Sequence, residues 1–356
     1  MNKPTTTAPT TTALSATDLR TEYLGLSLKN PLVPSSSPLT GDFDNARRLE
    51  DAGAAAIVLP SLFEEALLHE EEQMTRFLDH QPIGHPEAQS FLPDLPEYAS
   101  ELDQHVARIE RYKESLSIPV IASLNGVTPQ GWVRHAKDLQ DAGCDALELN
   151  LYGIAARRDE TAAEVEARYL QVVRSLLETV SIPLTVKLSA QFSSPVNFIG
   201  ELENLGVKGV ALFNRFYQPD IDLASRHVVP RIQLSHSYEA LLRIRWIALL
   251  RGQVGLGIAG TGGFHTHEDV LKGLMAGADA VHVCSALLRE GPDYLRTILF
   301  GMSAWMEQEE YSSVQQLKGS LSQRHAANPS AYERANYAEL LGQDALLKVD
   351  LKRHRE

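Results

Sequence analysis

The chain has 356 residues, of which 44% are hydrophobic, and its 46 acidic residues against 33 Lys and Arg give a formal net charge of -13. This balance argues against nucleic-acid binding, which needs clustered cations, and against adsorption to anionic lipid. Two cysteines form no disulfide framework and fit a reducing cytoplasm. The N-terminal segment lacks the apolar core of a signal peptide, and no apolar run is long enough to cross a bilayer.

Three regions are expected along the chain. Residues 1–18 are rich in Thr and Pro and bury too little to offset their ordering entropy, so they are predicted to form a disordered tail. Residues 19–310 carry the apolar segments and are predicted to form one domain. Residues 311–356 are polar and are predicted to form a helical extension packed outside that domain.

Short apolar runs alternate with amphipathic stretches through the domain. The runs that have the length of buried strands are Pro31–Ser35, Ala55–Leu59, Pro119–Ser123, Ala146–Asn150, Leu184–Leu188, Gly209–Phe213, Val254–Ile258 and Ala280–Cys284. This βα rhythm predicts a parallel sheet, and the number of strands is the number that a closed barrel needs. We therefore expect an α/β fold, a single-domain (β/α)₈ TIM barrel.

The connections between the predicted strands are of two kinds. Helices over Asp44–Ala52, Gly131–Ala142 and Leu271–Ala276 each end at a glycine that is followed by a strand, which predicts the same αβ joint three times. The connections Ser61–Arg108 and Arg215–Arg231 are much longer. In barrels, long βα insertions lie over the C-terminal mouth, where the chemistry takes place.

A glycine-rich turn gives the strongest local signal. Gly260-Thr261-Gly262-Gly263 stands between the seventh strand and the next helix. The N–H groups of such a turn form a nest for anions, and the helix that follows adds positive potential. The loop after strand eight, Cys284-Ser285-Ala286-Leu287, stands where a barrel completes a phosphate site. The two loops predict a phosphate cradle; the alternative is a tight βα turn without a ligand.

Polar residues also mark the carboxyl ends of other strands. Lys187 ends the fifth strand, and a cation there is suited to stabilising a reduced, anionic flavin; the alternative is a solvated lysine. Asn125, Asn150 and Asn214 each lie at or just past a strand end. Because buried amides are costly unless they are paired, three of them around one mouth predict hydrogen bonding to a planar heterocycle. Each alone is more often a turn residue.

In order and spacing, these segments resemble the dihydroorotate dehydrogenases over residues 20–305. The matching texts are Leu28-Lys29-Asn30-Pro31, Glu148-Leu149-Asn150-Leu151, Val186-Lys187-Leu188, Gly260-Thr261-Gly262-Gly263 and Ser285-Ala286-Leu287. The resemblance implies a barrel that binds FMN, with the FMN phosphate on Gly262, Gly263, Cys284 and Ser285. It implies a flavin ring near Ser35, Ser36, Asn125, Asn150, Lys187 and Asn214, and it places Ser235 in a segment that contacts FMN.

The substrate half of the site departs from the family. The family's catalytic cysteine stands in a text like N-L-S-C-P-N after strand four, and Gly153 occupies that position here. The T-K-S lysine after strand two is replaced by the text Val58-Leu59-Pro60-Ser61, and the N-S-M-G-L-P-N loop by Gln89–Asp94. A base is needed because dihydroorotate oxidation removes a proton from one carbon as hydride leaves the next.

Two residues are candidates for the acid–base role. Tyr152 lies beside the lost base. A tyrosine hydroxyl, with an ordinary pKa of about 10, suits an acid better than a base. The alternative is a ring packed under the loop. A histidine can serve as an acid or a base near neutral pH, and His236 lies in the FMN-contacting segment; the alternative is a helix-start histidine. Arg157, Arg158 and Arg215 either bind a substrate carboxylate or face water.

We therefore predict a cytoplasmic, FMN-dependent oxidoreductase that acts on CH–CH bonds. Its nominal reaction is dihydroorotate to orotate in pyrimidine biosynthesis, and Gly153 leaves another substrate open. The electron acceptor is unidentified, with a protein among the options, and a homodimer is expected. No metal site is expected, since the acidic run Glu64–Glu72 is not an HExxH motif. The alternatives are an electron-relay flavoprotein subunit without catalysis of its own, a flavin-dependent reductase of RNA uridine, and a phosphate-binding barrel without flavin.

Overall fold

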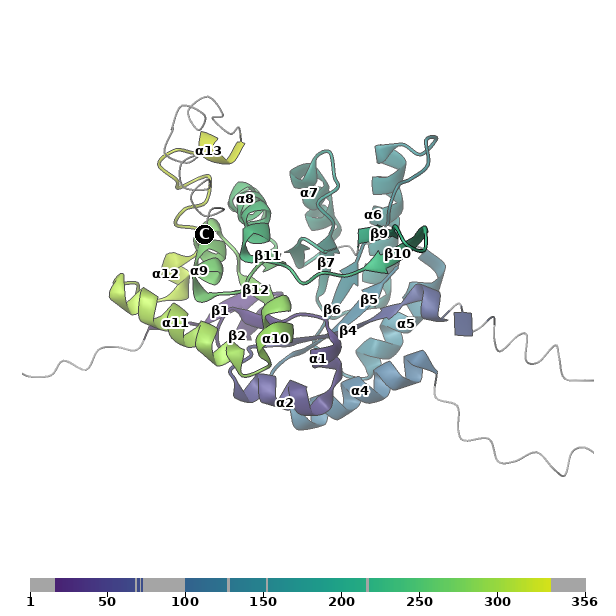
Figure 1. Ribbon diagram of the computed structural model, residues 1–356, viewed down its shortest axis with the longest axis horizontal. Coiled ribbons are helices and arrows are strands. Elements are labelled where there is room, and N and C mark those ends of the chain that lie inside the picture. Colours follow the sequence, from purple (N-terminus) through teal and green to yellow (C-terminus); the bar gives the residue numbers. More distant parts are fainter. Residues whose placement is uncertain are drawn as a thin grey trace, which may run out of the picture.

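A parallel barrel forms the centre of the molecule (Figure 1). The computed structural model describes residues 17–67, 69–70, 72, 100–126, 129–151, 153–215 and 218–333. Eight strands pair in the order β3-β12-β11-β8-β7-β6-β5-β4. They are β3 (Leu32–Pro34), β4 (Ile57–Phe63), β5 (Val120–Asn125), β6 (Ala146–Asn150), β7 (Leu184–Leu188), β8 (Gly209–Leu212), β11 (Gly257–Thr261) and β12 (Ala280–Val283). The N–H of Ala55, just before β4, donates to the carbonyl of Leu32 in β3 at 3.0 Å, so the barrel is nearly closed.

Helices surround the barrel and cover the outward faces of its strands (Figure 1). They are α1 (Pro38–Gly41), α2 (Phe43–Asp51), α4 (Glu101–Ser115), α5 (Pro129–Asp141), α6 (Ala162–Thr179), α7 (Pro195–Leu205), α8 (Ala240–Leu250), α9 (His267–Ala276), α10 (Ser285–Glu290) and α11 (Tyr294–Gln308). Among the described helices, none is long and apolar enough to cross a membrane. The predicted α/β barrel is confirmed.

All the predicted strands form: two have the predicted bounds, four differ by one or two residues at one or both ends, and two are displaced further. The seventh, expected over Val254–Ile258, runs over Gly257–Thr261, because Val254 pairs with Arg251 in a turn and the register with β8 begins at Gly257. The second was expected to end at Leu59 but continues to Phe63. Its pairing with β5 shifts between Val58 and Ser61, around a proline that has no N–H to donate.

The helix–strand joints form as the glycines predicted. Gly53, Gly143 and Gly277 have positive φ angles of 106°, 96° and 127° after α2, α5 and α9. Helix α9 also has a reciprocal cap at its start, where the Thr266 N–H donates to Asp269 at 3.1 Å and the Asp269 N–H donates to the Thr266 hydroxyl at 3.4 Å. The helix that follows the glycine turn is therefore fixed at both ends.

The N-terminal half of the barrel interior is lined by small side chains and filled from outside. Ala146, Ala211, Ala259 and Ala280 face one buried cluster with Tyr23, which belongs to the antiparallel pair β1 (Thr21–Tyr23) and β2 (Leu26–Leu28). The Tyr23 side chain is 1% exposed, and its hydroxyl lies 2.9 Å from the Thr185 hydroxyl in β7. The β1–β2 hairpin thus plugs this end of the barrel.

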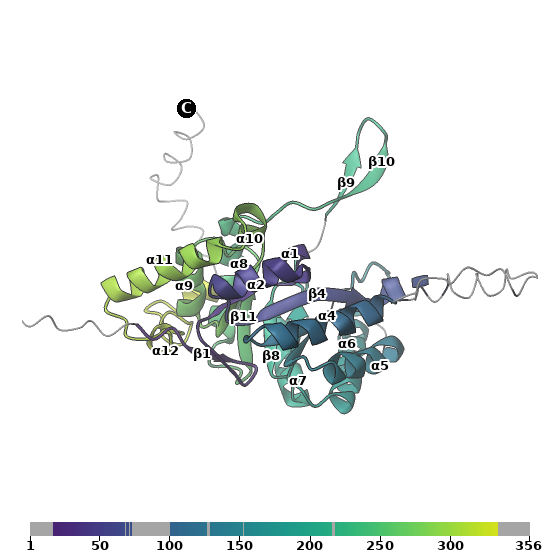
Figure 2. The same ribbon diagram turned by 90° about the horizontal axis from the view of Figure 1, so that it is seen from below.

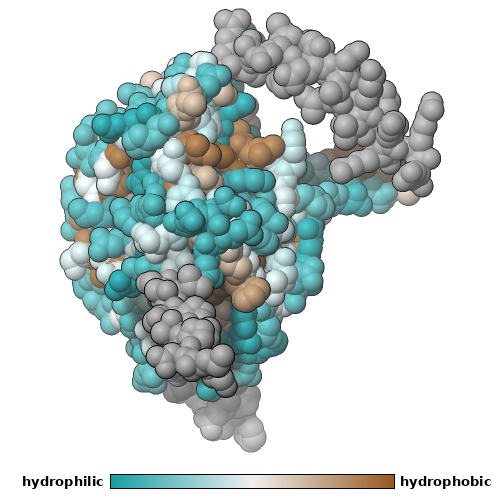
Figure 3. Space-filling model, turned by 90° about the vertical axis from the view of Figure 1, so that its left-hand side faces the viewer, coloured by the Kyte–Doolittle hydropathy of each residue, from teal (hydrophilic) through white to brown (hydrophobic). Residues whose placement is uncertain are grey.

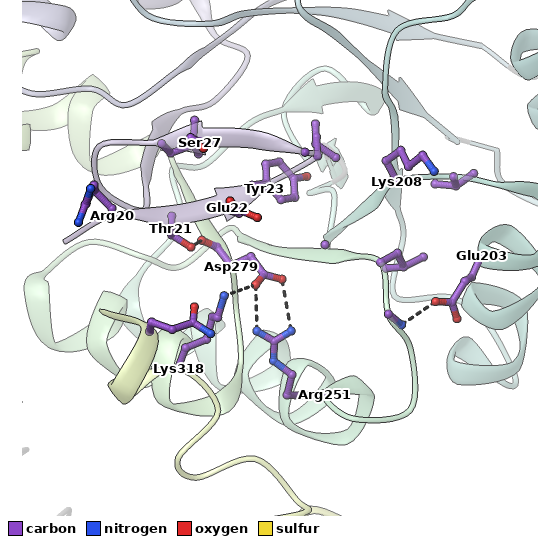
Figure 4. Close-up of a pocket in the computed structure, with 18 of the residues that line it drawn as sticks. Arg20, Thr21, Glu22, Tyr23, Ser27, Glu203, Lys208, Arg251, Asp279 and Lys318 are labelled. Carbon is purple, nitrogen blue, oxygen red and sulfur yellow. Dashed lines mark hydrogen bonds and ion pairs between the residues drawn. The ribbon is translucent and has the colours of Figure 1, made fainter. Parts of the chain in front are cut away.

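The buried carboxylate of Asp279 connects several segments at the same end of the barrel (Figure 4). Asp279 accepts hydrogen bonds from Arg251 at 2.9 Å, from Lys318 at 2.8 Å and from the Ile258 N–H at 2.8 Å. A hollow of about 1110 Å³ opens beside these residues. Because Asp279 engages both cations, the arrangement joins the end of α8, strand β11 and the C-terminal segment.

The two terminal regions meet at this end. Asp18, which was assigned to the predicted tail, accepts a hydrogen bond from the Val314 N–H at 2.8 Å and donates its own N–H to Ser312. The described part of the expected C-terminal extension contains α12 (Val314–Leu317) and α13 (Ser330–Glu333). Residues 1–16 and 334–356 lie outside the described residues. Figure 3 shows that the side carrying α11 and α12 is largely hydrophilic with small scattered apolar groups.

The long connection after β8 contains an antiparallel hairpin, β9 (Gln218–Asp222) and β10 (His227–Arg231), which projects from the barrel (Figure 2). Successive side chains alternate between the two faces of this hairpin. Ile221 lies opposite Val228 on an exposed apolar face, and Asp220 forms an ion pair with Arg231 on the other face. The second long connection leads from β4 to α4, and residues 73–99 of it lie outside the described residues.

Replacement of Tyr23 by alanine is expected to lower the free energy of unfolding by about 3–5 kcal/mol, because alanine-lined walls cannot close around the cavity it leaves. Tyr23→Phe keeps the ring and is expected to cost about 1 kcal/mol for the lost hydrogen bond. Tyr238→Ala is the matched control, since that side chain is 82% exposed. Chemical denaturation measures all three. Equal stability of Tyr23→Ala and Tyr238→Ala would contradict the plug.

Candidate active site

A cavity of about 290 Å³ lies at the carboxyl ends of β3, β7, β8, β11 and β12. This volume is near the lower end of the range of about 300–1,000 Å³ that is usual for small-molecule pockets. All the predicted cofactor residues except Asn125 and Asn150 line it: Ser35, Ser36, Lys187, Asn214, Ser235, Gly262, Gly263, Cys284 and Ser285. Phe213, Phe264 and Leu288 add apolar walls. The fold has therefore gathered residues from five strands into one site.

The glycine turn at one end of the cavity is constrained by its neighbours. Gly262 and Gly263 have φ angles of 86° and 89°, a region that favours glycine. A Cβ on Gly263 would lie 2.2 Å from the backbone nitrogen of Ala240, at the start of α8. The Gly263 N–H donates to the Ser235 hydroxyl at 3.3 Å, and the Ser235 N–H donates to the Ser285 hydroxyl at 3.1 Å. The two predicted cradle loops are thus joined through Ser235.

A buried arginine that the sequence did not reveal as functional supports this turn. Arg243 in α8 donates from Nε to the Thr261 carbonyl at 3.1 Å and from Nη1 to the Glu239 carbonyl at 2.9 Å. Its burial lowers the pKa of its guanidinium, which nevertheless stays charged at neutral pH. Its Nη2 lies 3.0 Å from the position of a Cβ on Gly262. A cation therefore lies directly behind the cradle, where it favours a bound anion.

The floor of the cavity is formed by ionisable side chains from three strands. Lys187 in β7 is 7% exposed, and its ammonium lies 3.2 Å from Oε1 of Glu148 in β6. Oε2 of Glu148 lies 3.6 Å from Nδ1 of His282 in β12. Both Glu148 and His282 are buried. The alternative that Lys187 is a solvated lysine is wrong, because its side chain is enclosed and paired.

The sequence could have indicated Glu148 and His282 through strand periodicity. Glu148 lies two residues before Asn150, and His282 lies two residues after Ala280, so each shares the inward face of its strand. An acidic residue and a histidine on inward faces of buried strands are rare enough to mark a site. Glu148 lies within one of the segments that resemble the family, and His282 lies outside them.

The three asparagines have different surroundings. Asn214 lines the cavity, and its side-chain oxygen accepts the Arg215 N–H at 2.8 Å. Asn150 donates to the Ser123 hydroxyl at 2.9 Å and to the Leu124 carbonyl at 3.2 Å. Asn125 is buried and pairs in register with Asn150 at the end of β5. Contact of Asn125 and Asn150 with a flavin stays a prediction.

The acid–base candidates are Tyr152 and His236. Tyr152 lies outside the described residues. The side chain of His236 is exposed, one residue beyond Ser235, and its N–H donates to the Glu239 carboxylate at 3.1 Å. The carbonyl of Gly153, the residue that the motif resemblance aligns with the family's cysteine, accepts a weak hydrogen bond from the Tyr169 hydroxyl at 3.4 Å. His236 is not among the residues that line the cavity.

The remaining cations and the cysteine of the site can also be placed. Arg215 lines the cavity and pairs with Glu239 at 2.9 Å. Arg157 is exposed and pairs with its neighbour Asp159, and Arg158 is exposed. Burial raises the pKa of the Cys284 thiol, so this group is neutral at neutral pH and acts as a weak hydrogen-bond donor. Of the three arginines proposed for a carboxylate, only Arg215 lies at the cavity.

A cavity at the carboxyl ends of a parallel eight-stranded barrel defines a ligand site in the place where enzymes of this fold carry out chemistry. A sequence profile described as Dihydroorotate dehydrogenase matches residues 96–306. The chain belongs to the dihydroorotate dehydrogenase family and is an oxidoreductase of that family. The resemblance drawn from the motifs is confirmed.

Three relatives illustrate the similarity. The chain is 27% identical over 327 residues to the catalytic subunit of dihydroorotate dehydrogenase B (NAD(+)) of Thermoplasma acidophilum, covering 85% of this chain and 98% of that protein. A protein of the same description from Pyrococcus abyssi is 28% identical over 311 residues, with 85% and 98% covered. A putative dihydroorotate dehydrogenase A (fumarate) of Aeropyrum pernix is 28% identical over 322 residues, with 86% and 98% covered.

Gly263→Ala is expected to destabilise the protein by about 1–3 kcal/mol, because the new methyl group would overlap the backbone of α8. Gly206→Ala is the matched control: Gly206 also has positive φ, 102°, but a Cβ there meets nothing within 4 Å. The difference between the two variants in thermal or chemical denaturation isolates the steric overlap from the backbone strain. Equal losses would mean that α8 moves away without cost.

Protonation of His282 is expected to reduce stability at acid pH. Burial lowers the pKa of His282 from 6.5 to about 4; Glu148 opposes this shift and Lys187 adds to it. As the pH falls below 6.5, the unfolded chain binds a proton that the folded protein does not bind until about 4, so the free energy of unfolding falls across this range. His282→Gln should remove this part of the decline in urea denaturation. An unchanged decline would assign it to other groups.

Proposed function

We propose that the cavity binds FMN and that the protein catalyses a flavin-dependent reaction of a CH–CH bond. The observation that carries the proposal is a single cavity with a tightly packed glycine turn backed by Arg243 at one end and the buried Lys187 at its floor. The glycine turn backed by Arg243 suits a phosphate. The buried Lys187 suits an electron-rich ring system, because a buried cation favours negative charge that develops beside it.

The residues of the chain divide between the two ends of the proposed ligand. Gly262, Gly263, Cys284 and Ser285 would hold the phosphate, with Ser235 joining their loops. Ser35, Ser36, Asn125, Asn150, Lys187 and Asn214 would surround the flavin ring. Bound FMN would supply the acceptor for a hydride. The protein's own contribution is to fix the ring over the floor of the cavity, to exclude water with Phe213 and Phe264, and to provide charge at the floor.

The substrate side is where this chain differs from the family pattern. With glycine at residue 153, the base that would take a proton from dihydroorotate has to come from another side chain, and Tyr152 and His236 are the candidates that we propose. A phenol favours delivery of a proton to an activated double bond over its removal from a saturated carbon. We therefore propose a substrate that need not be dihydroorotate, with Arg215 at the cavity available for a carboxylate.

The electron acceptor is proposed to be separate from the barrel. The similar proteins of Thermoplasma acidophilum and Pyrococcus abyssi are described as catalytic subunits of an NAD(+) enzyme, and that of Aeropyrum pernix as a putative fumarate enzyme. Because these two relatives are catalytic subunits, a protein partner that receives electrons is favoured, and the electron-relay alternative stays open. The homodimer and the cytoplasmic location stay predictions.

The deciding measurement is an anaerobic absorbance spectrum of the purified protein before and after addition of dihydroorotate. We expect the purified protein to show a flavin spectrum. Acid extraction should release the flavin, which should be identified as FMN. Bleaching by dihydroorotate would establish the family reaction, and Tyr152→Phe and His236→Gln would then be compared for the rate of bleaching. A flavin spectrum that dihydroorotate leaves unchanged would reject orotate chemistry and keep the FMN site. A colourless protein that does not take up added FMN would reject the proposal.

A further inference from the structure

The interior of the barrel changes character between its two ends. Below lies the apolar plug around Tyr23, and above lies the cavity. Between them, the inward faces of β6, β7 and β12 present the carboxylate of Glu148, the ammonium of Lys187 and the imidazole of His282. Glu148 is 0% exposed and His282 is 1% exposed. Lys187 and His282 line the cavity, and Glu148 lies behind them.

Glu148 has one oxygen for each neighbour. Oε1 lies 3.2 Å from the Lys187 ammonium, which makes a buried ion pair. Oε2 lies 3.6 Å from Nδ1 of His282, and neither this oxygen nor either ring nitrogen of His282 has a hydrogen-bond partner among the described residues. The hydroxyl that approaches from below belongs to Tyr23, and it pairs with Thr185 instead. Glu148 is therefore placed to act on Lys187 and on His282.

A buried carboxylate is costly, and its presence needs a reason. An ion pair in a low-dielectric interior gains attraction, but this gain seldom exceeds the cost of removing two charges from water. An apolar pair would fill the same space at no electrostatic cost. The pair does, however, determine how much positive charge a ligand in the cavity meets, since Glu148 offsets the charge of Lys187 from the side opposite the ligand.

We propose that Glu148 is a positioning residue that holds the Lys187 ammonium at the cavity floor and offsets its charge, so that a bound flavin meets an ion pair rather than a free cation. His282 lies 3.6 Å from the second carboxylate oxygen and completes this cluster. The proposal rests on the proposed FMN site. The ion pair would set the reduction potential of the flavin. A free lysine would raise that potential further, because it favours the reduced, anionic form of the flavin.

The test is the midpoint potential of FMN bound to the whole protein, measured by anaerobic spectroscopic titration against reference dyes. Glu148→Gln removes one negative charge and leaves Lys187 unpaired. We expect it to raise the potential and so to tighten the binding of reduced over oxidised FMN by about tenfold or more, because unit charges in such an interior interact by several times the thermal energy. Lys187→Met should lower the potential, and the double variant should lie near the wild type.

Two controls separate this role from a structural one. Glu203→Gln makes the same change of charge at the plugged end of the barrel, where Glu203 accepts the Gly255 N–H (Figure 4), and it should leave the potential unchanged. His282→Gln replaces one neutral side chain by another and should have little effect on the potential. A raised potential in Glu203→Gln equal to that in Glu148→Gln would overturn the proposal, because net charge alone would then be sufficient.

A conservative variant keeps the test open if Glu148→Gln does not fold. Glu148→Asp retains the charge but withdraws it from Lys187 by one methylene, and it should give a smaller rise in potential. A potential equal to that of the wild type in whichever of the two variants folds would overturn the proposal. Failure of the wild-type protein to bind FMN at all would instead reject the proposed function, so the two outcomes are distinct.

Discussion

Tyr23 fills the N-terminal half of the barrel because the strands carry alanine there, where barrels more often carry branched side chains. Gly209 and Gly257 let its ring approach the strands, since a Cβ on either would lie within 3.2 Å of a ring carbon. Its hydroxyl then meets Thr185, the first polar group above the apolar layer. This plug closes one end of the interior, so polar side chains higher in the barrel can only face upward, toward the cavity.

The site follows from that constraint and from a second one at the glycine turn. Because the start of α8 lies against Gly263, the turn strongly favours glycine, and Arg243 of the same helix is fixed behind it. The cavity thus has a positive end for an anion and a floor whose charges offset one another. This division agrees with the membership of the dihydroorotate dehydrogenase family, in which one ligand carries both a phosphate and a ring.

The lining of the cavity was largely predictable, because its signals are local. The glycine turn, the loop at Cys284 and Lys187 lie at strand ends that the apolar runs identify, and parallel strands bring their carboxyl ends together in any barrel. The acid–base group was not predictable in the same way. Residue 153 belongs to a βα loop, where neither periodicity nor capping restricts the side chain, and His236 proved to be exposed beside the cavity-lining Ser235.

The sequence by itself determined the eight strands of the barrel and the places of the glycine turn and of the loop at Cys284, because each depends on patterns within a few residues. Only the tertiary structure decided which distant residues meet. Glu148, Lys187 and His282 come from three different strands, and Arg243 reaches the turn from a helix that reads as apolar. The physical reason is that a buried charge is stable only beside its partner, and the partner's position is set by the closure of the barrel.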